Sequence, residues 1–234
     1  GIGGARTNCE SGYLFQKFIR KGIGSPHIDN CARVCHAPSL NGLKYALGEG
    51  ASPSCYDDIL EAEFIMVIGS NTTEAHPIVA NRVLESNKKG ASLCIVDIRE
   101  IHLSQRANFQ ITLPPEGNLL FLNCMARVIL EEGLYNKEFI KHRVSGFESY
   151  KESVLSDPYS DPNIFKKLKG YEHVAMQVRE CARIYALSKS IILWGLGVSE
   201  HTDGSYSVSA IANLALITGH IGKQGEGLLP LRGQ

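Results

Sequence analysis

Residues 64–68, Phe64-Ile65-Met66-Val67-Ile68, form a continuous apolar run that leads directly into Gly69-Ser70-Asn71. An uninterrupted apolar run of this length predicts a strand buried on both faces, as in a parallel sheet. Leu93-Cys94-Ile95-Val96, followed by Asp97, has the same pattern. Between the two runs, residues 72–86 predict a helix, which ends where Gly90 follows two lysines. The three segments therefore predict a right-handed βαβ unit with parallel neighbouring strands.

The alternation of strand and helix continues along the chain. Further strands are predicted at residues 109–113 and 191–194, and helices at residues 9–20, 118–132, 174–185 and 205–218. Residues 24–60 are rich in Gly, Pro, Ser, His and Cys and predict irregular loops with short helices. We therefore expect an α/β fold, a Rossmann-like doubly wound and mostly parallel sheet with helices on both faces, over roughly residues 60–220.

Composition excludes several classes of protein. The 234 residues carry 24 Lys and Arg against 24 Asp and Glu, and this balance without a basic stripe argues against nucleic-acid binding. Apolar runs have the length of strands, and the first residues do not resemble a signal peptide, so we expect no membrane contact by this segment. Three of the seven cysteines lie in apolar segments, which indicates a reducing compartment. We expect the cytoplasm, with the periplasm as the alternative if a leader has been removed.

Three predicted loops, residues 69–74, 97–99 and 195–201, follow strands and should converge at the ligand-binding edge of the sheet. Gly69, Ser70 and Asn71 begin a helix and favour an anion such as a pyrophosphate. Asp97 can accept bonds from ribose hydroxyls or a base edge, and Arg99 adds a cation. The alternative is a capped helix beside a surface ion pair. Gly69 lacks the Gly-x-Gly-x-x-Gly pattern, which argues against a nicotinamide cofactor.

Glycines and a histidine beside these loops have two interpretations each. Gly195 and Gly197 follow a predicted strand and either let the backbone approach a ligand closely or form a tight turn with positive φ. His76 begins a helix beside the expected anion site, where it either caps the helix or contacts the ligand.

Several reactive side chains lie within one short segment, Cys31-Ala32-Arg33-Val34-Cys35-His36. Thiolate and imidazole suit a soft metal, but a zinc site would need four ligands, such as Cys31, Cys35, His36 and His27, and the spacing matches no common zinc motif. A Cys35 nucleophile activated by the adjacent His36 is a weaker alternative, because adjacent side chains rarely face each other. For Cys31 we favour a packed loop residue.

The string from Asp29 to Ser39 resembles the signature of molybdenum- or tungsten-dependent formate dehydrogenase catalytic subunits. Other stretches are similar to the same family in the same order, namely Tyr13–Phe18, Val67–Pro77, Trp194–Val198 and Leu231–Gln234. The resemblance covers nearly the whole chain and implies a molybdopterin oxidoreductase.

The resemblance implies a molybdenum or tungsten atom held by two molybdopterin guanine dinucleotides, one of which occupies the loops described above. The residues that it implies in or near this cofactor site are Gly69, Ser70, Asn71, Glu74, His76, Asp97, Arg99, Gly117, Gly195 and Gly197. A guanine dinucleotide in place of NAD agrees with the missing glycine pattern.

The resemblance also implies the catalytic residues. Cys35 matches the cysteine or selenocysteine that binds the metal, and a thiolate suits a soft, high-valent centre. His36 matches a residue near the substrate that takes up a proton, and Arg232 matches the guanidinium that holds the formate carboxylate. Together they imply oxidation of formate to carbon dioxide.

The chain differs from the whole family subunit, which is longer and has an upstream 4Fe-4S cysteine motif that is not found here. Pro114–Asn118 also differs from the family's usual turn. We expect an internal piece: residues 1–30 as a lead-in from a neighbouring pterin-binding domain, residues 31–230 as the Rossmann-like dinucleotide domain, and residues 231–234 as the start of the next segment. The isolated piece should fold without oxidising formate.

Implied partners are formate, the rest of the catalytic subunit, and electron-transfer subunits that contain iron–sulfur clusters or are linked to NAD, F420 or a hydrogenase. The alternative families are formylmethanofuran dehydrogenase, assimilatory nitrate reductase and a non-catalytic domain as in complex I. Formylmethanofuran dehydrogenase shares the Cys-His pair, whereas nitrate reductases usually lack the histidine. Retention of both Cys35 and His36 argues against a non-catalytic domain.

Overall fold

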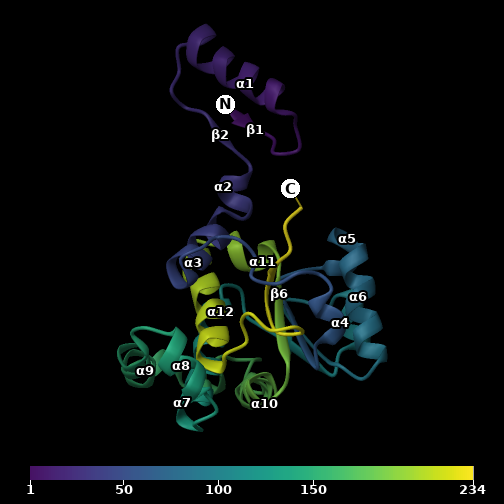
Figure 1. The fold of residues 1–234 in the computed structure, drawn as a ribbon, viewed down its shortest axis with the longest axis vertical. Helices are drawn as coiled ribbons and strands as arrows, with labels where there is room; N and C mark the ends of the chain where they lie inside the picture. Colours follow the sequence, from purple (N-terminus) through teal and green to yellow (C-terminus); the bar gives the residue numbers. More distant parts are fainter. Residues whose placement is uncertain (234) are drawn as a thin grey trace.

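A five-stranded parallel sheet forms the centre of the computed structural model, which describes residues 1–233 (Figure 1). The strands β3 (Phe64–Ile68), β4 (Ser92–Asp97), β5 (Phe109–Thr112), β6 (Ser190–Trp194) and β7 (Gly227–Pro230) lie in the order β5-β4-β3-β6-β7. Ile68 at the end of β3 pairs with Val96 on one side and with Trp194 on the other. The strand order reverses between β3 and β6, which confirms the predicted doubly wound sheet and makes this the topological switch point.

Helices cover both faces of the sheet (Figure 1). The helices and helical turns are α1 (Cys9–Lys17), η1 (Phe18–Gly22), α2 (Ala32–Cys35), α3 (Ala37–Leu47), α4 (Asp58–Glu61), α5 (Thr72–Ala75), α6 (Pro77–Lys88), η2 (His102–Arg106), α7 (Asn118–Glu131), α8 (Lys137–Arg143), α9 (Phe147–Ser156), η3 (Pro158–Ser160), η4 (Pro162–Lys167), α10 (Val174–Leu187), α11 (Leu196–Ser199) and α12 (Gly204–Thr218).

The strands divide their side chains between two apolar cores, because successive residues of a strand point to opposite faces. From β3, Met66 and Ile68 join the core beneath α7, α10 and α12, whereas Ile65 and Val67 join the core beneath α4 and α6. Every residue of β3 and β6 is buried, which explains why their sequences are apolar without alternation.

Three expectations about secondary structure need correction. The predicted helix over residues 72–86 is two helices, α5 and α6, because Pro77 disfavours a helical conformation at His76, where φ is −142° and ψ is 63°. Residues 24–60 contain the 11-residue helix α3 rather than short helices alone. A fifth strand, β7, was not among the predicted strands, because Gly227 and Pro230 at its ends are unfavourable in strands; its edge position tolerates proline.

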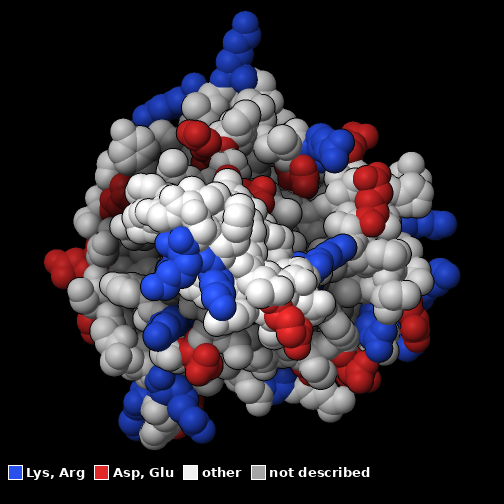
Figure 2. Space-filling model, turned by 90° about the horizontal axis from the view of Figure 1, so that it is seen from above, with Lys and Arg blue, Asp and Glu red and all other residues white. Residues whose placement is uncertain are grey.

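The N-terminal segment lies above the carboxyl ends of the strands, on the side where the chain also ends (Figure 1). It contains β1 (Ile2–Gly3), which pairs in parallel with β2 (Asp29–Asn30), and α1. No residue of α1 is buried, and Tyr13, Leu14 and Phe18 are each about 60% exposed. On the face seen in Figure 2, charges of both signs are present; the part nearest the viewer is mostly uncharged but carries a group of Lys and Arg side chains. Within residues 1–233, no helix is long and apolar enough to cross a bilayer.

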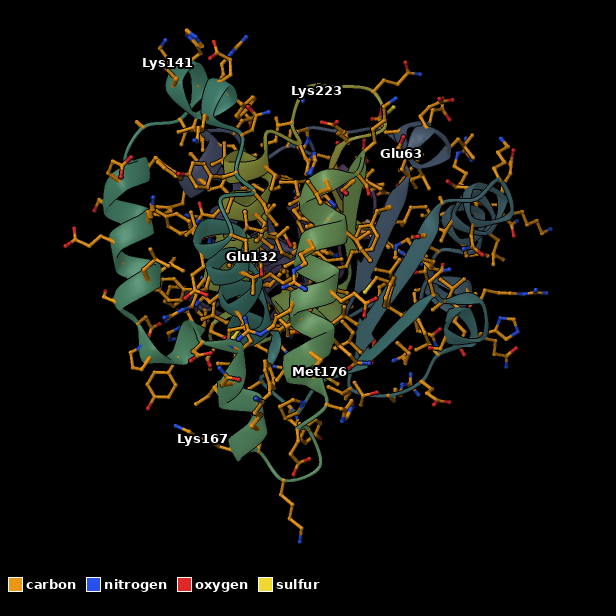
Figure 3. The ribbon with its side chains drawn as sticks, turned by 90° about the horizontal axis from the view of Figure 1, so that it is seen from below. Glu63, Glu132, Lys141, Lys167, Met176 and Lys223 are labelled. Atoms are coloured by element: carbon orange, nitrogen blue, oxygen red, sulfur yellow. The ribbon has the colours of Figure 1, made fainter. Side chains whose placement is uncertain are left out.

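Polar contacts join neighbouring segments at the opposite, amino-terminal end of the strands, which Figure 3 shows from below. Glu63, directly before β3, accepts a hydrogen bond from the Lys189 backbone N–H before β6. Glu132 accepts two hydrogen bonds of 2.7 and 2.8 Å from the Arg183 guanidinium, which joins the end of α7 to α10. These contacts stabilise the sheet on the side away from the polar loops.

Candidate functional site

The loops after β3 and β6 pack against each other at the switch point. Gly197 N–H donates to the Gly69 carbonyl at 3.0 Å, and Gly195 N–H donates to the Ile68 carbonyl at 3.2 Å. A Cβ built on Gly69 would lie 2.8 Å from the Gly197 carbonyl carbon, and a Cβ on Gly197 would lie 2.8 Å from the Gly69 Cα. Only Gly69 of these has positive φ, at 58°. The positive-φ interpretation of Gly195 and Gly197 is therefore wrong, and their close approach is to the neighbouring loop.

Cys35 ends α2 and lies above this pair of loops. Its backbone carbonyl accepts a 2.5 Å hydrogen bond from Ser199 Oγ, and Ser199 is completely buried at the end of α11. The loop after β6 therefore fixes the backbone at Cys35. Partial burial, then the Glu200 carboxylate and Cys31, raise the pKa of the Cys35 thiol, so a metal ion must displace its proton on binding.

His36 joins α2 to α3 and is buried, with 8% of its surface exposed. Its Nε2 lies 3.0 Å from the Leu231 carbonyl oxygen, and its Nδ1 lies 3.0 Å from Ser39 Oγ. Burial lowers the pKa of His36, and the nearby Arg232 and His76 lower it further, against the opposing effect of the Leu231 carbonyl. The ring is therefore held neutral, with a hydrogen-bonding partner at each nitrogen.

Arg232 follows β7 and brings a half-buried guanidinium to the same region. Its Nη2 donates to the Gly50 carbonyl at 2.8 Å. Its Nε is buried and has no hydrogen-bonding partner among the described residues. Because an unpaired buried donor is costly, this guanidinium is suited to an anion that completes its hydrogen bonds.

Two adjoining cavities share Cys35 and His36. The smaller, of about 280 Å³, is also lined by Arg232, and the larger, of about 360 Å³, reaches the switch-point loops. Both ring nitrogens of His76, which lines the larger cavity, are buried and without a partner among residues 1–233. The residues that line the larger cavity are Arg6, Cys35, His36, Gly69, Ser70, Asn71, Ala75, His76, Gly195, Leu196, Leu231 and Gly233.

The donor atoms fit a metal whose remaining ligands come from a bound organic group. Within the described chain, no three His, Cys, Asp or Glu side chains cluster as a metal site, which argues against the four-ligand zinc alternative. Cys35 is placed to supply one soft ligand, and the unpaired His76 nitrogens are free to bind polar atoms of the group that carries the others.

The structure brings part of the predicted site together. Seven predicted residues line the larger cavity, and Arg232 lines the smaller one. Among residues 1–233, neither cavity is lined by Glu74, Asp97, Arg99, Gly117 or Gly197.

Two of these outlying residues lie at the tip of β4 and one lies before α7. Burial raises the pKa of the Asp97 carboxyl, which accepts a 3.3 Å hydrogen bond from the Arg99 backbone N–H. A Cβ on Gly117 would meet Pro114, and the adjacent Asn118 side chain donates to the Gly197 carbonyl at 2.8 Å. The loop before α7 is thus a neighbour of the loop after β6. Gln234 lies outside the described residues.

Sequence patterns missed several residues that build the site. Arg6 lines the larger cavity and donates to the Gly233 carbonyl through Nε and Nη2, at 3.2 and 3.0 Å. Ser39 and Ser199 are fully buried and hold His36 and Cys35. A serine in an apolar helix face is the signal that could have identified Ser39, since buried hydroxyls need partners. Arg6 has no such local signal.

The sequence matches the family model described as molybdopterin oxidoreductase over residues 1–232. It is 39% identical over 229 residues to formate dehydrogenase H of Escherichia coli (strain K12), covering 97% of this chain and 31% of that protein. It is 38% identical over 231 residues to the F420-dependent formate dehydrogenase subunit alpha of Methanocaldococcus jannaschii, covering 98% of this chain and 34% of that protein.

Among solved structures, the fold is similar to acetylene hydratase from Pelobacter acetylenicus, with a TM-score of 0.78 and 23% identity. That match covers 97% of this chain and 30% of the hydratase chain, and at this identity it supports the fold alone. The chain spans about a third of the length of the curated relatives it matches.

Proposed function

Because the chain belongs to the molybdopterin oxidoreductase family, we propose that it is the dinucleotide-binding domain of a formate dehydrogenase catalytic subunit. The complete enzyme oxidises formate to carbon dioxide and passes the electrons to a 4Fe-4S cluster upstream of this domain. One observation carries the proposal: Cys35 and His36 lie between two cavities, one lined by Arg232 and the other by the loops of the switch point.

The larger cavity is the proposed entrance to the cofactor site. Gly69, Ser70, Asn71, His76 and Gly195 face one molybdopterin guanine dinucleotide, of two in the complete enzyme. The nucleotide extends toward the neighbouring loops, where it is contacted by the residues outside the cavity, namely Glu74, Asp97, Arg99, Gly117 and Gly197. This direction is supported by the general binding of nucleotides at the switch point of doubly wound sheets.

The chain's own residues bind and orient the substrate and the metal. When bound, the pterin-held molybdenum or tungsten supplies the two-electron acceptor for formate oxidation. Cys35 contributes a thiolate ligand, and the raised pKa of its thiol means that it is protonated until the metal binds. Arg232 binds the formate carboxylate with the Nε donor that has no partner among the described residues. His36, beside Cys35, holds the backbone that leads to Arg232 through Nε2. It is also the proposed proton acceptor, a role that requires Nδ1 to exchange its contact with Ser39 Oγ for the proton.

Other parts of the complete enzyme provide the rest of the active site. The partners are the remainder of the catalytic subunit and electron-transfer subunits that contain iron–sulfur clusters or are linked to NAD, F420 or a hydrogenase. Since the chain spans about a third of its relatives, the 234-residue chain alone should fold but not reduce a dye with formate. Formate-dependent dye reduction by the purified 234-residue chain would contradict this expectation.

Replacement of Cys35 in the full-length protein tests the function. Wild type, Cys35→Ala and the control Cys9→Ala are purified anaerobically, and formate-dependent reduction of benzyl viologen is measured. Cys9 is exposed at the start of α1 and is not a lining residue of either cavity, so its variant should keep full activity. Cys35→Ala should lose it. Full activity of Cys35→Ala would exclude the assigned role.

A substrate screen separates the proposed activity from those of related families. The wild-type protein is offered formate, nitrate and formylmethanofuran in parallel, with molybdenum and tungsten measured in the same sample. Turnover of formate supports the proposal. Turnover of nitrate or formylmethanofuran without turnover of formate overturns the proposal. A protein that contains much less than one molybdenum or tungsten atom per chain overturns it as well.

A further inference from the structure

We propose that Ser39 and Trp194 are positioning residues, which hold His36 and the backbone before Arg232 in a closed ring of hydrogen bonds. Ser39 lies in α3, Trp194 ends β6 and Leu231 follows β7. The ring therefore joins three segments that are far apart in the sequence. It deepens the proposed function, and its kinetic consequence depends on that function.

The ring consists of four hydrogen bonds. Trp194 Nε1–H donates to Ser39 Oγ at 2.9 Å, and Ser39 Oγ lies 3.0 Å from His36 Nδ1. His36 Nε2 lies 3.0 Å from the Leu231 carbonyl, and Leu231 N–H donates to the Trp194 carbonyl at 2.9 Å. Ser39 and Trp194 are 0% exposed, Leu231 is 1% exposed and His36 is 8% exposed, so water has little access to these groups.

The chemistry of the four groups fixes the direction of every bond. The Leu231 carbonyl can only accept, so His36 Nε2 carries a hydrogen. The indole N–H can only donate, so Ser39 Oγ accepts it and directs its own hydrogen to His36 Nδ1. We assign the Nε2–H tautomer of His36 on this basis. Each group donates and accepts in the same sense around the ring, an arrangement in which hydrogen bonds strengthen one another.

The ring sets the spacing between the two reactive side chains. Cys35 directly precedes His36, and Arg232 directly follows Leu231, so both lie one residue from a member of the ring. If Ser39 loses its hydroxyl, the Trp194 N–H has no acceptor and His36 Nδ1 has no donor. The imidazole can then rotate, the Leu231 carbonyl loses its partner, and the segment that carries Arg232 becomes more mobile.

The test uses the full-length protein with the variants Ser39→Ala, Trp194→Phe and Ser207→Ala. Ser207 is a matched control, because it is fully buried in α12 and its hydroxyl has no partner among residues 1–233. The first measurement is amide hydrogen exchange, followed by mass spectrometry, in the peptide that contains Leu231. This readout does not require formate, metal or turnover.

We expect exchange at the Leu231 amide to accelerate at least tenfold in Ser39→Ala and in Trp194→Phe, and to stay at the wild-type rate in Ser207→Ala. Exchange at the wild-type rate in Ser39→Ala would overturn the proposal. If Ser39→Ala does not fold, Trp194→Phe alone decides, since it breaks the same Trp194–Ser39 hydrogen bond by removing the indole donor while keeping an aromatic ring.

The second measurement is the kinetics of formate oxidation. Displacement of Arg232 weakens formate binding, so the KM of Ser39→Ala should rise about tenfold, and rotation of His36, the proposed proton acceptor, should lower kcat as well. A uniform loss of kcat with unchanged KM would indicate general destabilisation and would overturn the positioning role. If the wild-type protein does not oxidise formate, the proposed function fails while the exchange result still tests the ring.

Discussion

Replacement of Gly69 by alanine should destabilise the fold by more than a backbone effect alone. Gly69 has φ of 58°, and alanine at such an angle costs about 1–2 kcal/mol. The new Cβ would also lie 2.8 Å from the Gly197 carbonyl carbon and 2.9 Å from the Val198 nitrogen. Both are backbone atoms that cannot rotate away, and overpacking of this kind costs about 1–3 kcal/mol. The expected loss of unfolding free energy is about 2–5 kcal/mol.

Two matched variants separate the contributions to this loss. Gly133 has φ of 68° with open space around its Cβ, so Gly133→Ala should cost only the backbone part, about 1–2 kcal/mol. Gly197 lies in α11 without positive φ, and its Cβ would lie 2.8 Å from the Gly69 Cα. Gly197→Ala should cost up to about 2 kcal/mol, because better helix propensity offsets part of the clash.

Urea denaturation of the 234-residue chain measures these free energies. Trp194 is the sole tryptophan and is fully buried, so its fluorescence reports unfolding of the sheet next to both loops. The order of destabilisation should be Gly69→Ala greatest, with Gly133→Ala and Gly197→Ala well below it. If Gly69→Ala and Gly133→Ala have equal unfolding free energies, the two switch-point loops do not pack as tightly as described here.

Three further outcomes are expected. Burial lowers the pKa of His220, so the unfolded chain binds a proton more readily than the folded chain below about pH 6.5, and His220 should lower the unfolding free energy there by up to about 1.4 kcal/mol per pH unit. Burial also lowers the pKa of His36, which adds a contribution of the same sign, so His220→Gln should reduce the slope in urea titrations without abolishing it. In the native chain at pH 8, a thiol reagent should label the exposed Cys9 and Cys55 before the buried Cys94, Cys124 and Cys181. Burial raises the pKa of Cys124 to about 12, so early labelling of Cys124 in mass spectra would refute its placement. In the full-length enzyme, Arg232→Lys should raise the KM for formate roughly 10- to 100-fold, since lysine cannot offer a planar fork; an unchanged KM would exclude formate binding by Arg232.

Local patterns were sufficient for the buried strands β3, β4 and β6, but they missed β7, whose four residues are also buried. β3, β4 and β6 each contain an uninterrupted apolar run, and the crossover between the first two predicted that β3 and β4 are parallel neighbours; the position of β6 beside β3 was not predicted. α3 was not predicted as one long helix because it depends on tertiary packing: Gly42 lets it approach α12 so closely that a Cβ there would lie 2.7 Å from Val208 Cβ. Propensity alone does not carry that information.

The candidate site also combines residues that a local motif identifies with residues that only the fold brings together. Cys35 and His36 are adjacent in the sequence, so a local motif identifies them. Their partners are distant: Trp194 is 155 residues from Ser39, and Leu231 is 195 residues from His36. Only the folded chain brings these groups together, because the strand order places β6 and β7 beside the helix that follows Cys35. The switch-point glycines pack two loops against each other, a contact that the sequence did not predict, and their contact with a ligand stays a prediction.

X-ray absorption at the molybdenum or tungsten edge of the full-length protein tests most directly whether sulfur from residue 35 binds the metal. Wild type and Cys35→Ser are prepared anaerobically, and the number of sulfur atoms around the metal is compared. One sulfur fewer in Cys35→Ser is the expected result. An equal sulfur count in both proteins, with the metal fully incorporated, would contradict the assignment.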